Sequence, residues 1–146
     1  GYNYRLTNLH AAVGLAQIEQ LATFIERKRE IARAYEQALR DLEGVTLMPT
    51  PPDTEPTYWL YTILLPEGTT VQERQEWLAR LRAQGIEARP LWHPIHGLPP
   101  YRDCQAVEIT CAPDVYARAI SLPSSAGLSD TDVQRCASVV KELWPR

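Results

Sequence analysis

The chain has 146 residues, 45% of them apolar, which is enough for one globular domain with a core of its own. Its net charge of −3, with acidic residues scattered among the arginines, provides no basic face for a nucleic acid. No apolar run approaches the roughly 20 residues that span a bilayer, and no secretory signal begins the chain, so we expect a cytoplasmic protein.

Apolar periodicity predicts one long N-terminal helix over residues 8–42, with Thr7 as its N-cap. The second half has the pattern of an amphipathic surface helix, whereas residues 6–18 contain no charged side chain. A domain of this size can hardly surround a whole helix. We therefore expect residues 6–18 to be covered by a surface that this chain does not supply, in a further domain, a second subunit or both. The alternative is a helix in the interior of this domain.

The rest of the chain alternates between strand-like and helix-like stretches. The expected order is strand, central strand, helix, strand, short helix, strand and helix, over residues 45–48, 57–66, 70–85, 86–91, 113–119, 120–125 and 129–144. Thr69 or Thr70 is expected to cap the first of these helices, and Ser129 the last. Strands interleaved with helices that pack on one face predict an α/β fold, a two-layer sandwich.

Residues 92–103, WHPIHGLPPYRD, are rich in proline and are expected to be irregular. His93 and His96 begin a cluster with some character of a metal site, which Cys104 and Cys111 complete. The two thiols stand seven positions apart, however, unlike the close pairs of structural zinc sites, so we expect no metal. All three cysteines are expected to be reduced packing groups.

A catalytic set is not visible in the sequence, which lacks a glycine-rich phosphate loop, a pair of carboxylates and a nucleophile motif. The chain contains two lysines, Lys28 and Lys141. Both lie in charged helical stretches. We expect both amines to be solvated, with no lowering of their pKa values by an apolar environment.

The sequence as a whole resembles the C-terminal portion of the DegT/DnrJ/EryC1/StrS family. The resemblance is carried by GYNYRLTNLHAAVGLAQIEQL, FIERKREIARAY, YWLYTILLP, RPLWHPIHGLPPY and ISLPSSAGLSDTDVQR. Members of this family are pyridoxal-phosphate-dependent aminotransferases of fold type I that act on nucleotide-linked keto-sugars. The segment RPLWHPIH is most similar to the subgroup that aminates C4 of sugars such as perosamine or bacillosamine precursors.

The resemblance implies that residues 1–146 are the small C-terminal domain of such an enzyme. The large domain, with the Schiff-base lysine and most of the pyridoxal 5'-phosphate site, is then absent from this sequence, and the chain alone is expected to be an inactive excised fragment. In the intact enzyme, glutamate is the expected amino donor. The alternative is a stand-alone dimerisation or ligand-binding module without catalysis.

The resemblance also assigns candidate site residues. In a homodimer, Asn3 reaches the cofactor phosphate of the partner subunit, to which an amide donates without adding a charge. Arg5 binds a substrate phosphate or carboxylate nearby, or else anchors the helix start in an ion pair. In the proline-rich loop, His96 hydrogen-bonds the substrate, or is a satisfied loop histidine, and Trp92 covers the sugar or the base. His93 stands where the family often has lysine, so a phosphate contact there is expected to be weak or pH-dependent.

Overall fold

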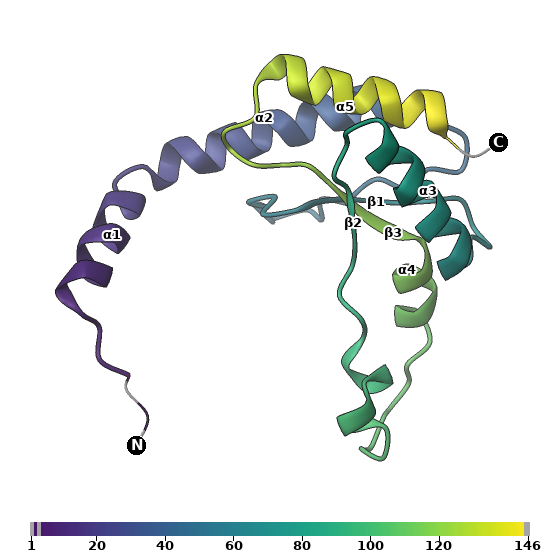
Figure 1. Ribbon diagram of the computed structural model, residues 1–146, viewed down its shortest axis with the longest axis horizontal. Helices are drawn as coiled ribbons and strands as arrows, with labels where there is room; N and C mark the ends of the chain where they lie inside the picture. Colours follow the sequence, from purple (N-terminus) through teal and green to yellow (C-terminus); the bar gives the residue numbers. More distant parts are fainter. Residues whose placement is uncertain (1, 3, 145–146) are drawn as a thin grey trace.

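The computed structural model describes residue 2 and residues 4–144, and it has an α/β fold (Figure 1). The elements in chain order are α1 (Asn8–Ile18), α2 (Leu21–Leu39), β1 (Tyr61–Leu64), α3 (Val71–Ala83), β2 (Arg89–Pro90), the 3-10 helices η1 (Ile95–Gly97) and η2 (Pro99–Tyr101), α4 (Ala112–Arg118), β3 (Ala119–Leu122) and α5 (Asp130–Leu143). The α/β class is confirmed, and the two-layer arrangement stays a prediction. Among the described helices, none combines the length and apolarity needed to cross a membrane.

The helix predicted over residues 8–42 is divided into α1 and α2, because the chain turns at Glu19 and Gln20. Thr7 caps α1 as predicted. At the turn, the side-chain amide of Gln20 donates to the carbonyl of Ala16 at 3.1 Å and satisfies an acceptor in the last turn of α1. Figure 1 shows α1 pointing away from the rest of the chain, while α2 runs beside α5.

The described residues of α1 include none that is buried. Its apolar side chains face solvent, with exposed fractions of 74% for Leu9, 57% for Val13 and 68% for Ile18. The alternative of an interior helix within this domain is therefore wrong. An uncharged, apolar helix surface of this kind agrees with the expectation of a cover from outside the chain, which itself stays a prediction.

The sheet has β3 at its centre, antiparallel to β1 on one side and to β2 on the other. Residues 57–66 are expected to form the central strand, but they supply only β1, which lies at the edge of the sheet. On the side away from β3, β1 makes a single bridge, from Leu64 to Thr46. The strand predicted over residues 45–48 is reduced to this bridge, and the one over 86–91 to the two residues of β2. The sheet is thus smaller than the β-prone sequence predicts.

Strand β1 begins late because of the backbone at Tyr58. This residue has φ of +49°, in the left-handed region that ends an extended strand. The turn directs Trp59 out of the sheet and leaves its side chain exposed. The alternation predicted for residues 57–66 therefore holds only from Tyr61 onward, where buried and half-buried residues alternate.

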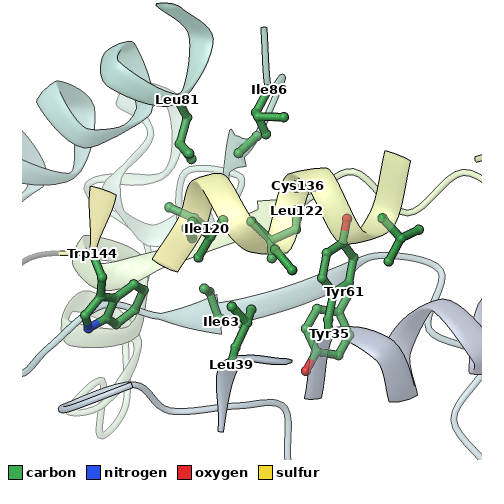
Figure 2. Packing of buried hydrophobic residues seen from close by; sticks show 14 of the residues in the cluster. Tyr35, Leu39, Tyr61, Ile63, Leu81, Ile86, Ile120, Leu122, Cys136 and Trp144 are labelled. Atoms are coloured by element: carbon green, nitrogen blue, oxygen red, sulfur yellow. The ribbon is translucent and has the colours of Figure 1, made fainter. Parts of the chain in front are cut away.

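The hydrophobic core lies between the sheet and helices α2, α3 and α5 (Figure 2). The helices contribute Ile31, Tyr35, Leu39, Trp77, Leu78, Leu81, Val133, Cys136 and Val140. The rings of Tyr35 and Tyr61 stack at 5.2 Å, and the Tyr35 hydroxyl donates to the carbonyl of Pro123 at 2.7 Å. Burial raises the pKa of Tyr35, which keeps this hydroxyl a neutral donor.

Of the three cysteines only Cys136 packs in the core, whereas Cys104 and Cys111 are exposed, so the packing role predicted for those two is wrong.

Helix α5 begins with a capping box between Ser129 and Asp132, whose hydrogen bonds to Ser129 lower the pKa of the Asp132 carboxyl. A carboxyl with a lowered pKa in the folded state stabilises the protein above its unfolded pKa, and this contribution is lost as pH falls through the folded pKa. Asp132→Asn should therefore be less stable than the wild type at neutral pH. The difference should vanish in acid, when Asp132 is protonated. Urea unfolding over a pH series measures it.

The control for this prediction is Asp103→Asn, at an exposed position outside the helices. It should leave the free energy of unfolding unchanged at every pH. A difference between Asp132→Asn and the wild type that stays constant from neutral to acid pH would mean that the capping carboxylate contributes nothing through its charge.

Candidate functional site

Residues 91–111 project from the body of the domain between β2 and α4 (Figure 1). The prolines of this segment fix φ and remove backbone donors, so that it contains only the short helices η1 and η2. The irregular structure predicted for residues 92–103 is confirmed. Trp92 and His93, at the start of the segment, each contact an aromatic ring from another part of the chain.

Trp92 stacks on Trp59, the residue that the turn before β1 directs outward. The two ring centroids are 5.6 Å apart and the ring planes differ by 17°. Each side chain is nevertheless 68% exposed. One face of the Trp92 indole is therefore occupied by Trp59, and the opposite face is available to a flat or apolar ligand ring.

The carbonyl of Trp59 is held by Lys28 of α2, whose ammonium donates to it at 2.8 Å. The Ser124 hydroxyl donates to the same oxygen at 3.5 Å. Partial burial lowers the pKa of the Lys28 amine. The prediction of a solvated amine with no lowered pKa is thus wrong for Lys28. Lys141 is exposed on α5, as predicted.

His93 turns toward the domain, and its Nδ1 lies 3.1 Å from the hydroxyl of Tyr116 in α4. Behind the tyrosine lies the fully buried Arg74 of α3, whose guanidinium sits 4.8 Å from the Tyr116 ring centroid and donates to the Tyr116 carbonyl. On the other side, a Cβ at Gly97 would lie 2.6 Å from His93 Nε2. The imidazole is thus contacted on two sides by residues of the same chain, although His93 remains exposed. The pH-dependent phosphate contact expected for His93 stays a prediction.

His96 lies in η1 and is half-buried. It borders a depression that is also lined by Tyr101, Arg102 and Cys104. An imidazole and a guanidinium that line the same depression offer donors suited to a hydroxyl or a phosphate oxygen, and the substrate contact of His96 stays a prediction. In the part of the chain that the structure describes, no three His, Cys, Asp or Glu side chains gather as a metal-binding group.

The other two candidate residues belong to the N-terminal segment. Asn3 lies outside the described residues, and Arg5 is exposed just before α1. In Figure 1 the described residues just before α1 and the projecting segment 91–111 lie well apart, at the lower ends of two separate arms. The structure therefore does not bring Arg5 together with Trp92 and His96 within one chain.

The sequence patterns do not identify three residues around the candidate site. The β-prone pattern predicts a strand at Trp59, and no motif indicates a role for Tyr116 or Arg74. Arg74 had a usable signal, since it precedes Trp77 and Leu78 by three and four positions and so shares their buried helix face. The contact of Tyr116 with His93 joins residues 23 positions apart and leaves no local pattern.

Gly97→Ala should disturb the environment of His93, because the added methyl group would overlap the imidazole Nε2. We expect the NMR signals of the His93 ring protons to shift in this variant. Tyr116→Phe, which removes the hydroxyl beside Nδ1, should shift the same signals. The ring of His10, in α1, is the internal control and should stay unchanged. Unshifted His93 signals in both variants would contradict the contacts of the imidazole with Gly97 and Tyr116.

The fold matches that of one part of aminotransferases of known structure. Helicobacter pylori PseC, an aminotransferase involved in the biosynthesis of pseudoaminic acid, has a TM-score of 0.88 and 26% sequence identity, over 99% of this chain and 39% of that chain. S. venezuelae DesV, solved in complex with a ketimine intermediate, has a TM-score of 0.83 and 28% identity, over 100% of this chain and 38% of that chain.

The chain belongs to the DegT/DnrJ/EryC1/StrS aminotransferase family, whose model matches residues 1–141. Among curated relatives, the GDP-perosamine synthase of Escherichia coli O157:H7 is 39% identical over 99% of this chain, and that of Caulobacter vibrioides is 33% identical over 98%. This chain spans 38% of the length of each of these two relatives.

Proposed function

We propose that residues 1–146 are the C-terminal domain of a pyridoxal-phosphate-dependent aminotransferase that aminates a nucleotide-linked keto-sugar, with glutamate as the amino donor. The observation that carries the proposal is the similarity of nearly the whole chain to two GDP-perosamine synthases. Because the chain spans 38% of these relatives, we assign the remaining parts of the active site to protein outside this sequence.

The described residues do not fit the covalent site of pyridoxal 5'-phosphate. The Lys28 amine donates to the Trp59 carbonyl, and Lys141 lies on the exposed side of α5. When bound, the cofactor supplies the electron sink for amino transfer. We assign its lysine to the part of the protein outside this sequence, and to Asn3 a hydrogen bond to the cofactor phosphate in the partner subunit.

The projecting segment supplies the substrate contacts in this proposal. The exposed face of Trp92 covers the sugar or the base, and binding there gains from burial of apolar ring surface. His96 hydrogen-bonds a hydroxyl or a phosphate oxygen at the depression that it lines. Arg5 supplies a permanent cation for a phosphate or a carboxylate.

A homodimer accounts for two features of the chain. The exposed apolar side chains of α1 gain a covering surface, which the described part of this chain does not provide. In addition, the N-terminal segment and the projecting segment lie apart in one copy, and contact across an interface lets residues of both contribute to one site.

The test uses the full-length protein, expressed from a gene that includes the coding sequence upstream of Gly1. With pyridoxal phosphate and glutamate, it should convert a GDP-, UDP- or dTDP-linked 4-keto-sugar to the amino sugar and release 2-oxoglutarate. The matched control is the chain of residues 1–146 alone, which should form no product. A full-length protein that binds the cofactor but aminates none of these sugars would overturn the proposal. A start codon directly before Gly1 would favour the stand-alone module.

A further inference from the structure

We propose that Trp59 is a positioning residue for the substrate segment: it fixes the orientation of Trp92, and Lys28 in turn fixes Trp59. This inference rests on the proposed function, which gives Trp92 a ligand to contact. Trp59 lies outside the projecting segment and acts through Trp92. Three parts of the chain meet here, namely α2, the turn before β1 and the start of the projecting segment.

The backbone before Trp59 adopts a conformation that bulky residues rarely have. Tyr58 has φ of +49°, and such a conformation persists only where surrounding contacts determine it. Here the Tyr58 hydroxyl lies 3.0 Å from the Thr50 hydroxyl, and the Tyr58 ring is 6.1 Å from the ring of Tyr61. These contacts hold the turn, and the turn presents the Trp59 indole outside the sheet.

The peptide group that follows is also held. The Trp59 carbonyl accepts from the Lys28 ammonium at 2.8 Å and from the Ser124 hydroxyl at 3.5 Å. A hydrogen bond from a charged donor is stronger than one between neutral groups. The backbone of Trp59 is therefore held at two points, by the Tyr58 turn before it and by the hydrogen bond from Lys28 to its own carbonyl. This backbone determines where the indole lies.

Among the described residues, no hydrogen bond of this kind holds Trp92 within its own irregular segment. Its contact with Trp59 occupies one face of its ring, at 5.6 Å and 17°, which restricts the side-chain rotamers open to it. A ligand that stacks on the other face then meets a ring already oriented, and less conformational entropy is lost on binding. A ring inserted between the two indoles would have to separate them, so the ligand contact is on the outer face of Trp92.

A double-mutant cycle on Trp59 and Trp92 in the full-length protein tests this inference. Calorimetry with GDP-mannose, UDP-glucose and dTDP-glucose gives dissociation constants, and turnover of the keto-sugar gives KM and kcat. Trp59→Ala should raise the dissociation constant and KM about 2- to 10-fold, the range expected for loss of one aromatic pair. The value of kcat should be unchanged, since the orientation of Trp92 affects binding of the ground state and the transition state alike.

Three further variants separate positioning from a general loss of structure. In the Trp92→Ala background, Trp59→Ala should have no additional effect on the dissociation constant. Trp59→Phe retains a flat ring and should restore binding. Lys28→Met should weaken binding in the same direction as Trp59→Ala, whereas Lys141→Met, at the exposed lysine of α5, is the matched control and should bind as the wild type does.

An equal loss of binding from Trp59→Ala with and without Trp92 would overturn the inference, as would failure of Trp59→Phe to restore binding. A wild-type protein that binds none of the three nucleotide sugars and does not turn over the keto-sugar would instead overturn the proposed function. The near-ultraviolet circular dichroism of the ligand-free protein then decides about Trp59. Trp59→Ala and Trp92→Ala should remove the same stacked-indole signal, and loss of different signals would overturn positioning as well.

Discussion

Ile120→Ala should lower the free energy of unfolding of this chain by about 2–5 kcal/mol, the range for removing a fully buried aliphatic side chain from a core. Ile120 is completely buried in the central strand β3, opposite Ile63 of β1. Figure 2 shows it among the side chains of the core. Urea unfolding measures the loss of stability. If the slope of the free energy of unfolding against urea concentration is unchanged, the variant and the wild type expose the same amount of surface on unfolding. Ile120→Val should cost about 0.5–1.5 kcal/mol.

The matched control is Ile18→Ala, the same substitution on the exposed surface of α1. In the isolated chain it should change the free energy of unfolding by less than about 0.5 kcal/mol. In the full-length protein, where we propose that α1 is covered, the same substitution should be destabilising. A loss near that of Ile120→Ala in the isolated chain would show that α1 packs on this domain after all.

The helix starts were predictable because a cap depends on neighbouring residues. Thr7, Thr70 and Ser129 each accept a hydrogen bond from a backbone N–H three residues further on, a pattern written in the local sequence. The break after α1 was not predictable in this way. Neither glycine nor proline marks the turn at Glu19 and Gln20, and the apolar spacing continues across it.

The strands were less predictable because pairing decides where a β-prone run becomes a strand. The left-handed backbone of Tyr58 ends the extended conformation before β1, although Tyr is favourable in strands. The central position belongs to β3, which pairs with both other strands, and not to the longer apolar run that supplies β1. Neither outcome follows from the composition of the run itself.

The candidate site was predictable in its residues and not in its contacts. The segment from Trp92 to His96 has a sequence similar to that of the family, and its irregular structure follows from its prolines. Trp92 contacts Trp59, and Trp59 is hydrogen-bonded by Lys28. Both contacts join parts of the chain that are distant in sequence, and Lys28 and Trp59 are 31 residues apart. Such contacts exist only after folding, so a reading of local patterns treats Lys28 as a surface group.

Asn3→Ala in the full-length protein should weaken cofactor binding about 10- to 150-fold, since it removes one hydrogen bond to a charged group, roughly 1.5–3 kcal/mol. The measurement is a titration of the protein with pyridoxal phosphate after the bound cofactor has been removed. Thermal unfolding without cofactor should hardly change. The proposed homodimer adds a stronger condition, because the phosphate that Asn3 binds belongs to the partner subunit.

Mixed dimers test that condition directly. Protein with Asn3→Ala is mixed with a variant that lacks the cofactor lysine, and exchange of subunits is confirmed by mass spectrometry of differently tagged chains. In half of the sites of a mixed dimer, an intact lysine from one subunit then meets an intact Asn3 from the other, so activity should reappear although both parents are defective. The matched control mixes each variant with itself and should give no recovery. If mixed dimers form and show only the activity of the parents, Asn3 does not serve the neighbouring site, because a site built within one chain gains nothing from exchange.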